Sequence, residues 1–253
     1  MDKQQFILTI AGFDPSNGAG LTSDLKTFQA HGLYGLSVCT TVTVQNDIDF
    51  KSSHWVKPSL ILEQIEALFE RFEIQVVKIG IIENWKTLSE IIKRLKELNA
   101  TVKVILDPVL KASAGYDFHS EDELSVLDSI LDSIFIITPN FEEIKQLYPE
   151  KTLEDTIEYI SNKTNLYLKG GHRTELVGLD QLYYDKIVQL NIEPKGEGIS
   201  PKHGSGCVLS SSLASNIKLG YPIEEAAVLS KRYTEQFLTS NNGLLGNHVT
   251  ING

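Results

Sequence analysis

The sequence predicts an α/β fold, a three-layer α/β/α sandwich with a mostly parallel central sheet. Short apolar runs rich in Val and Ile alternate along the chain with segments whose apolar residues recur at helical spacing. Right-handed crossovers between such strands make the strands parallel and cover both faces of the sheet with helices. Because no linker-like or low-complexity segment interrupts the pattern, residues 1–253 are expected to form a single domain.

The first half of the chain alternates strands with helices. Strands are expected where β-branched and aliphatic residues gather, over residues 6–12, 36–45, 76–80 and 102–109. Helices are expected where apolar residues recur every three or four positions, over residues 24–32, 57–71 and 84–99. A turn rich in Gly, Asn, Ser and Pro separates the first strand from the first helix.

The second half continues the alternation and ends in helices. Further strands are expected over residues 133–140 and 166–171, and a hairpin over about 182–191. Helices are expected over residues 121–131, 141–147, 152–163, 206–219 and 223–239. Parallel sheets bind ligands at the carboxyl ends of their strands, and the polar clusters of this sequence lie there.

The composition excludes several classes of partner. Twenty-three basic and thirty-three acidic residues give a net charge of −10, which opposes attraction to nucleic acid and to anionic lipid. No apolar run approaches membrane-spanning length, and the N-terminal apolar stretch runs directly into Gly, Asp and Pro, which indicates a strand and not a signal peptide. Cys39 and Cys207 are too few for a disulfide framework, so a reducing cytoplasm is expected.

The segment from His203 to Cys207, HGSGC, is the strongest local signal. Gly204, Ser205 and Gly206 precede an amphipathic run, and N–H groups at a helix start can bind an anion. A glycine-rich helix cap without a ligand has the same pattern. Cys207 is either an inert, half-buried residue or a base, because the field of a helix N-terminus lowers a thiol pKa from about 8.5 toward neutrality.

Four other polar residues follow predicted strands. Asp107 lies in LDPV, Asn140 and Glu143 lie in TPNFEE, and Lys169 ends an apolar strand. Carboxylate and amide groups suit Mg²⁺ and its waters beside nucleotide phosphates, and the lysine is placed to reach a phosphate. The alternatives are an Asp-Pro turn, a helix-capping arrangement and a surface lysine.

Sequence motifs of other enzyme classes are absent. The chain has neither GxGxxG after its first strand nor GxxxxGK[ST], which argues against a Rossmann dinucleotide site and a P-loop. HExxH and GxSxG are also absent, which argues against a zinc protease of that type and a serine hydrolase.

These motifs, in this order, resemble the hydroxymethylpyrimidine/phosphomethylpyrimidine kinases of the ribokinase-like superfamily. Residues 11–46 are similar to the opening of that family, and VKIG, LDPV, TPNFEE, YLKGGH and HGSGC follow in its order. The resemblance implies ATP-dependent phosphorylation of 4-amino-5-hydroxymethyl-2-methylpyrimidine and then of its monophosphate, in thiamine biosynthesis. It also implies a homodimer and Mg²⁺ as a cofactor. Whether a monovalent cation is required stays open.

The resemblance assigns roles to individual residues. The residues implied to bind the pyrimidine are Gly12, Asp24, Gln45, Ile81 and Val109. Asp107 and Glu143 would hold the metal ion, and Asn140 and Lys169 the nucleotide. Gly204, Ser205 and Gly206 would form the anion hole, with Cys207 in the position of the catalytic base.

Three departures from the family pattern stand out. Pro201 and Lys202 replace the expected Asp-Thr, and Lys202 is expected to add a cation on the phosphate side. Lys111 puts a charge near the expected phosphates, and Phe13 replaces a small polar residue. Two alternatives to a pyrimidine kinase stay open: a pyridoxal or pyridoxine kinase, and a non-catalytic pyrimidine-binding sensor.

Overall fold

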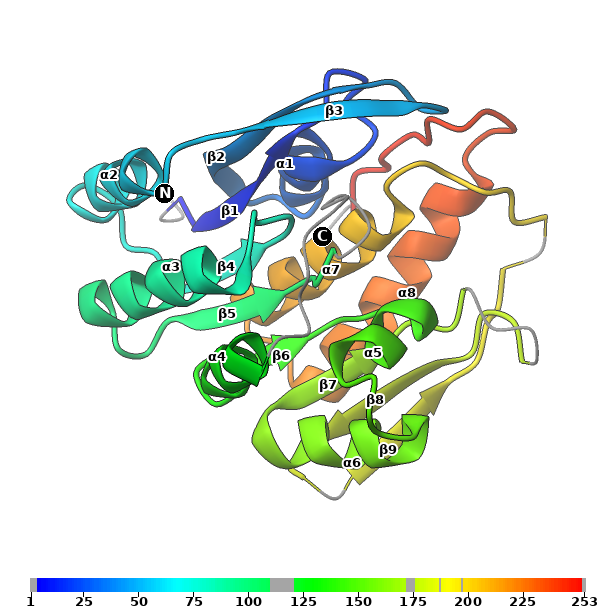
Figure 1. The fold of residues 1–253 in the computed structure, drawn as a ribbon. Helices are drawn as coiled ribbons and strands as arrows, with labels where there is room; N and C mark the ends of the chain where they lie inside the picture. The colour runs from blue at the N-terminus through cyan, green and yellow to red at the C-terminus, as the bar shows by residue number, and fades with distance from the viewer. Residues whose placement is uncertain (1–3, 110–120, 172–175, 187, 197, 252–253) are drawn as a thin grey trace.

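The computed structural model describes residues 4–109, 121–171, 176–186, 188–196 and 198–251 (Figure 1). Lys111 and His172 lie outside the described residues. The strands are β1 (Phe6–Phe13), β2 (Tyr34–Gln45), β3 (Phe50–Trp55), β4 (Val76–Ile79), β5 (Lys103–Leu106), β6 (Ile136–Ile137), β7 (Asn165–Leu168), β8 (Asp180–Tyr184) and β9 (Val188–Ile192). The helices are α1 (Gly20–Ala30), α2 (Pro58–Phe69), α3 (Trp85–Leu98), α4 (Glu121–Leu131), α5 (Phe141–Leu147), α6 (Leu153–Lys163), α7 (Ser205–Lys218) and α8 (Ile223–Thr239).

The described strands form one sheet in the order β3-β2-β1-β4-β5-β6-β7-β8-β9. The six strands from β2 to β7 in this order pair in parallel. Antiparallel strands flank them, with β3 on one edge and the β8–β9 hairpin on the other. The sheet is therefore mostly parallel, as the sequence predicts.

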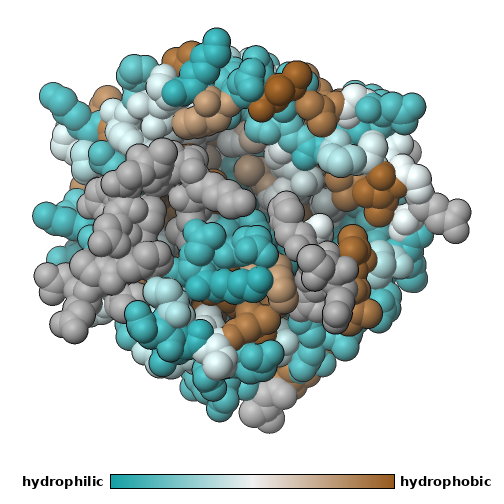
Figure 2. Space-filling view, turned by 45° about the vertical axis from the view of Figure 1, so that its right-hand side comes forward, coloured by the Kyte–Doolittle hydropathy of each residue, from teal (hydrophilic) through white to brown (hydrophobic). Residues whose placement is uncertain are grey.

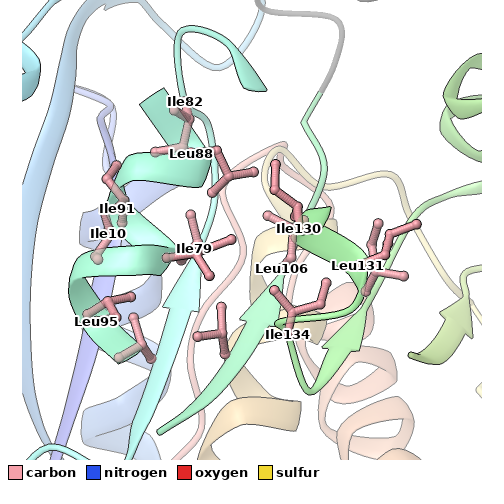
Figure 3. Packing of buried hydrophobic residues seen from close by; sticks show 14 of the residues in the cluster. Ile10, Ile79, Ile82, Leu88, Ile91, Leu95, Leu106, Ile130, Leu131 and Ile134 are labelled. Carbon is pink, nitrogen blue, oxygen red and sulfur yellow. The ribbon is translucent and has the colours of Figure 1, made fainter. Parts of the chain in front are cut away.

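Helices cover both faces of this sheet (Figure 1). On one face α2 to α6 pack over a cluster that includes Leu8, Ile10, Ile79 and Leu106, part of which Figure 3 shows. On the other face α1, α7 and α8 pack over a second cluster. Because side chains alternate between the faces of a strand, each central strand contributes to both clusters, which gives the predicted three-layer sandwich.

The predicted strands differ from the observed ones mainly at their ends. The strand expected at 102–109 ends at Leu106, and the strand expected at 133–140 is reduced to Ile136–Ile137. Pro108 and Pro139 lie just beyond these ends and have no N–H group to continue a ladder. The structure adds β3, which the sequence does not predict because FKSSHW has a polar centre and lies at a sheet edge.

The visible surface is mostly hydrophilic. Figure 2 shows a face on which hydrophilic side chains predominate, with smaller hydrophobic areas among them. Within the described part of the chain, every helix is too short or too polar to cross a lipid bilayer.

Candidate active site

The HGSGC segment forms a tight turn into α7. Gly204 is the N-cap of α7 and has a φ of +78°, in the left-handed region. A Cβ atom at this position would lie 2.0 Å from the carbonyl oxygen of Gly18, so only glycine fits. The first turn of a helix leaves backbone N–H groups without intrahelical partners, and these groups favour an anion. The turn therefore has the geometry expected of an anion loop.

A cavity of about 270 Å³ opens beside this loop. Among the described residues, its lining includes these candidates from the sequence: Asp107, Val109, Asn140, Glu143, Lys169, Gly204, Ser205, Gly206 and Cys207. They come from the carboxyl ends of β5, β6 and β7, from the first turn of α5 and from the start of α7. Segments far apart in the sequence thus meet at the sheet edge where ligands of parallel sheets bind.

Lys169 lies directly beneath the anion loop. Its Nζ is 2.6 Å from Oδ1 of Asp107 and would lie 3.4 Å from a Cβ atom at Gly206. Asp107 also accepts a hydrogen bond of 2.9 Å from the hydroxyl of Ser210, on the next turn of α7. Although burial opposes the charge of Lys169, the carboxylates of Asp107 and Glu143 raise its pKa, so the ammonium stays charged.

Asn140 and Glu143 form the capping box that the sequence allows. The side chain of Asn140 accepts hydrogen bonds from the N–H groups of Glu142 and Glu143, each 2.9 Å long. Glu143 accepts one of 2.8 Å from the N–H of Asn140. Both residues also line the cavity, so the structural and the ligand-binding interpretations apply together.

The pair of carboxylates is compatible with Mg²⁺. Asp107 and Glu143 line one cavity and offer oxygen atoms, which Mg²⁺ prefers. The described residues contain no cluster of three His, Cys, Asp or Glu side chains able to enclose a metal ion. Mg²⁺ commonly keeps several waters and binds through one or two carboxylates plus substrate phosphates, so two carboxylates suffice for this mode.

A second buried ion pair, absent from the sequence-based expectations, lies next to the first. Lys78 is in the middle of β4, and its Nζ is 2.9 and 3.0 Å from the two carboxylate oxygens of Asp24 on α1. Both side chains are 0% exposed. The sequence signal for such a pair is the lysine inside the apolar strand VVKI, because a buried lysine requires a partner; the signal does not say which residue the partner is.

This pairing corrects the role expected of Asp24. Its carboxylate also accepts hydrogen bonds from the hydroxyls of Thr9, at 2.5 Å, and Ser211, at 2.6 Å. These donors surround both oxygen atoms inside the protein. Asp24 therefore holds Lys78 and α7, and contact with a pyrimidine is not compatible with this geometry.

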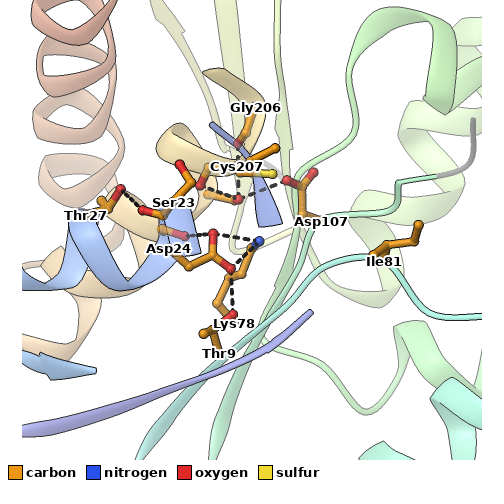
Figure 4. Close-up of polar contacts among 12 residues, drawn as sticks. Thr9, Ser23, Asp24, Thr27, Lys78, Ile81, Asp107, Gly206 and Cys207 are labelled. Atoms are coloured by element: carbon orange, nitrogen blue, oxygen red, sulfur yellow. Dashed lines mark hydrogen bonds and ion pairs between the residues drawn. The ribbon is translucent and has the colours of Figure 1, made fainter. Parts of the chain in front are cut away.

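Cys207 lies between the Lys78–Asp24 pair and Asp107 (Figure 4). The pKa of its thiol is raised to about 11. Burial raises this pKa most, and the charges of Asp24 and Asp107 raise it further, whereas Lys78 and a hydrogen bond from the N–H of Gly20 lower it. The pKa is therefore raised by desolvation and two carboxylates, opposite to the lowering that the sequence predicts at a helix start. Cys207 is a neutral thiol at pH 7.

The remaining residues expected at the pyrimidine lie apart from this lining. Gly12 and Ile81 meet each other, since a Cβ atom at Gly12 would lie 2.9 Å from Cγ2 of Ile81. Gln45 is half-buried at the end of β2. Of the expected pyrimidine-binding residues in the described chain, only Val109 lines the cavity. The roles of Gly12, Gln45 and Ile81 at the pyrimidine stay predictions.

Lys202 also differs from its expected role. Its Nζ donates hydrogen bonds to the hydroxyl of Ser200, at 2.8 Å, and to the carbonyl oxygens of Asn241, at 2.5 Å, and Gly243, at 2.7 Å. An ammonium group has three N–H donors, so all three are used inside the protein. Lys202 therefore does not reach toward nucleotide phosphates, and the expectation of a phosphate-side cation is wrong.

Asp14 and His203 join the anion loop to the turn before α1. Oδ2 of Asp14 lies 2.9 Å from Nε2 of His203 and accepts a hydrogen bond of 2.9 Å from the N–H of Ala19. Although burial raises the pKa of Asp14, hydrogen bonds from Ser16, His203 and Ala19 lower it below its usual value. The link aligns the two glycine-rich turns where Gly204 contacts Gly18.

Comparison with known proteins shows what the chain is similar to. The phosphomethylpyrimidine kinase family model matches residues 14–252. A hydroxymethylpyrimidine/phosphomethylpyrimidine kinase from Aquifex aeolicus is 35% identical over 217 residues, covering 83% of this chain and 84% of the relative. A bifunctional thiamine biosynthesis protein from Geobacter sulfurreducens is 30% identical over 97% of this chain, which spans about half, 51%, of its length.

Solved structures give the same fold. A phosphomethylpyrimidine kinase from Clostridium difficile has a TM-score of 0.75 at 32% identity, covering 92% of this chain and 99% of that one. A pyridoxal kinase from Bacillus subtilis has a TM-score of 0.80 at 23% identity, covering 94% and 92%. The second likeness concerns the fold alone.

The Lys78–Asp24 pair makes a testable contribution to stability. Lys78→Met leaves the Asp24 carboxylate buried without its counter-ion, and we expect the free energy of unfolding to fall by about 3–5 kcal/mol in urea denaturation. The control is Lys145→Met, which breaks the exposed pair with Glu142 and should cost about 1 kcal/mol or less. A loss for Lys78→Met as small as that of the control would contradict the assignment.

Proposed function

Because this chain belongs to the phosphomethylpyrimidine kinase family, we propose that it phosphorylates the hydroxymethyl group of 4-amino-5-hydroxymethyl-2-methylpyrimidine and then the monophosphate so formed, using ATP. It is a phosphotransferase. The observation that carries the proposed phosphoryl transfer is the cavity that joins the anion loop, Lys169, two carboxylates and a neutral thiol, and the family supports the choice of substrate. All described strands join one sheet, which supports residues 1–253 acting as a single catalytic domain.

The anion loop and Lys169 serve the transferring phosphoryl group. Its negative charge has to be neutralised while the attacking and leaving oxygens stand in line. The N–H groups at Gly204 and Gly206, with the ammonium beneath them, provide fixed donors that need no reorganisation, whereas the N–H of Ser205 makes a long hydrogen bond of 3.4 Å to the carbonyl oxygen of Lys202. Asn140 lines the same cavity and is assigned to the nucleotide.

Asp107 and Glu143 would hold the metal ion through its waters. When bound, Mg²⁺ neutralises charge on the phosphates. The carboxylate of Asp107 accepts hydrogen bonds from Lys169 and Ser210, and a longer one of 3.5 Å from the hydroxyl of Thr138, which fix its direction. The same group thus orients the phosphate-binding lysine and presents an anion to the metal side of the cavity.

A neutral thiol at position 207 suits two successive substrates. The monophosphate is mostly a dianion at pH 7, because a phosphate monoester has its second pKa near 6, and a carboxylate in place of Cys207 would repel it. Its phosphate oxygen is already ionised, so the second transfer needs no base. The first transfer must remove a proton from the hydroxymethyl group, and the small thiolate fraction of Cys207 is the acceptor that we assign.

We include assembly and location in the proposal. Exposed apolar side chains gather on the β2–β3 edge, at Val42, Val44, Ile48 and Phe50, which supports a homodimer joined through this edge. The free thiols of Cys39 and Cys207 support a reducing cytoplasm.

Substrate preference tests the proposed function. We expect kcat/KM in a coupled ADP-release assay to be higher for the pyrimidine alcohol and its monophosphate than for pyridoxal. Lys169→Met should lower turnover of every substrate, because it removes the cation beneath the anion loop. A higher kcat/KM for pyridoxal would favour a pyridoxal kinase, and pyrimidine binding without ADP release would favour a sensor; either result would contradict the proposal.

The two transfers should depend differently on Cys207. Cys207→Ser is expected to lower the first phosphorylation by about 10²–10⁴, the usual contribution of a general base, and the second much less. Because the thiol pKa is about 11, the thiolate fraction grows with pH, so wild-type kcat/KM for the alcohol should rise from about pH 7 to 9. Equal losses in both steps, or a first step independent of pH, would show that Cys207 only positions the substrate.

A further inference from the structure

Lys202 differs from the other buried lysines of the described chain in its partners. Lys78, Lys169 and Lys231 each have an aspartate within 3.0 Å. Lys202 is only 7% exposed, yet among the described residues its ammonium contacts neutral oxygen atoms: one hydroxyl and two backbone carbonyls. Burying a charge without a counter-ion is costly, so the arrangement of these oxygens has to compensate.

The oxygen atoms around Lys202 lie at the end of a helix. Asn241 and Gly243 follow α8, which ends at Thr239, and carbonyl groups at a helix C-terminus stabilise a cation. Rings of carbonyl oxygens are also what proteins use to replace the hydration shell of K⁺. Three neutral oxygens that converge on one positive charge therefore form a site of the type that binds a monovalent cation.

The same contacts tie two segments together. The N–H of His203 donates a hydrogen bond of 2.9 Å to the carbonyl oxygen of Leu244. The hydroxyl of Ser200 donates one of 3.0 Å to the carbonyl oxygen of Asn241. Lys202 lies inside this junction, two residues before Gly204. Its ammonium thus joins the C-terminal end of α8 to the segment that enters the anion loop.

We propose that the Lys202 ammonium is a tethered monovalent cation that positions the anion loop, in a cage that would otherwise take K⁺ or NH₄⁺. Wild-type protein therefore needs no added monovalent cation. Removing the side chain beyond Cβ turns the cage into a binding site for a free ion of this class. The inference goes beyond the proposed phosphorylation, because it concerns an ion that the chain itself supplies.

The test compares Lys202→Ala with wild type in chlorides of K⁺, NH₄⁺ and tetramethylammonium at one ionic strength. Thermal unfolding is measured without substrate, and kcat/KM is measured by ADP release. In tetramethylammonium, which is too large for the cage, we expect Lys202→Ala to lose about 10²-fold in kcat/KM, as for a misplaced catalytic group. K⁺ or NH₄⁺ should restore most of this loss and raise the melting temperature by roughly 2–4 °C.

Two further variants separate ion binding from packing. Lys202→Met fills the cage without a charge, so its melting temperature should not respond to K⁺ or NH₄⁺. Lys96→Ala removes a half-buried lysine that donates to a single carbonyl, of Val102, and its melting temperature should be the same in all three salts.

The proposal fails if wild type requires K⁺ or NH₄⁺, or if Lys202→Ala behaves identically in the three salts. Failure of Lys202→Ala to fold in any salt would also overturn it, since a free ion should replace the ammonium. The melting temperatures test cation binding even if no substrate is phosphorylated. Failure of this proposal can therefore be told apart from failure of the proposed function.

Discussion

Two buried lysine–aspartate pairs beneath the first turns of α7 are the constraint on which the rest of the site depends. Lys78 with Asp24 joins β4 to α1, and Lys169 with Asp107 joins the residues that directly follow β7 and β5. Ser211 and Ser210 of α7 donate to these two carboxylates, so the helix is held at a set height above the sheet. Because a broken buried pair leaves an unpaired charge, strands, helix and loop are stabilised together.

The charges that hold the helix also set its chemistry. Burial with carboxylates nearby keeps Cys207 neutral, whereas Lys169 keeps its charge next to the anion loop. The site therefore combines a strong anion-binding region with an uncharged group at the nucleophile. Under the proposed function, this combination would accept an alcohol in one reaction and a phosphate monoester in the next with one arrangement of charges.

Much of the fold follows from periodicity, but pairing inside the core does not. Each predicted helix is present, whereas β3 has too polar a centre to be recognised. Motifs after strands indicated Asp107, Glu143 and Lys169, because strand ends of a parallel sheet converge. Long-range partners carry no local pattern: the role of Asp24 depends on Lys78, 54 residues away, and that of Lys202 on Asn241 and Gly243.

The most direct test of this account is the pKa of Cys207. In protein carrying Cys39→Ser, the rate at which iodoacetamide alkylates Cys207 can be followed by mass spectrometry as a function of pH. The charges around the thiol predict a rate that keeps rising with pH toward a pKa of about 11. A rate that levels off at or below about 8.5, the ordinary cysteine value, would contradict the claim that buried carboxylates and desolvation hold this thiol neutral.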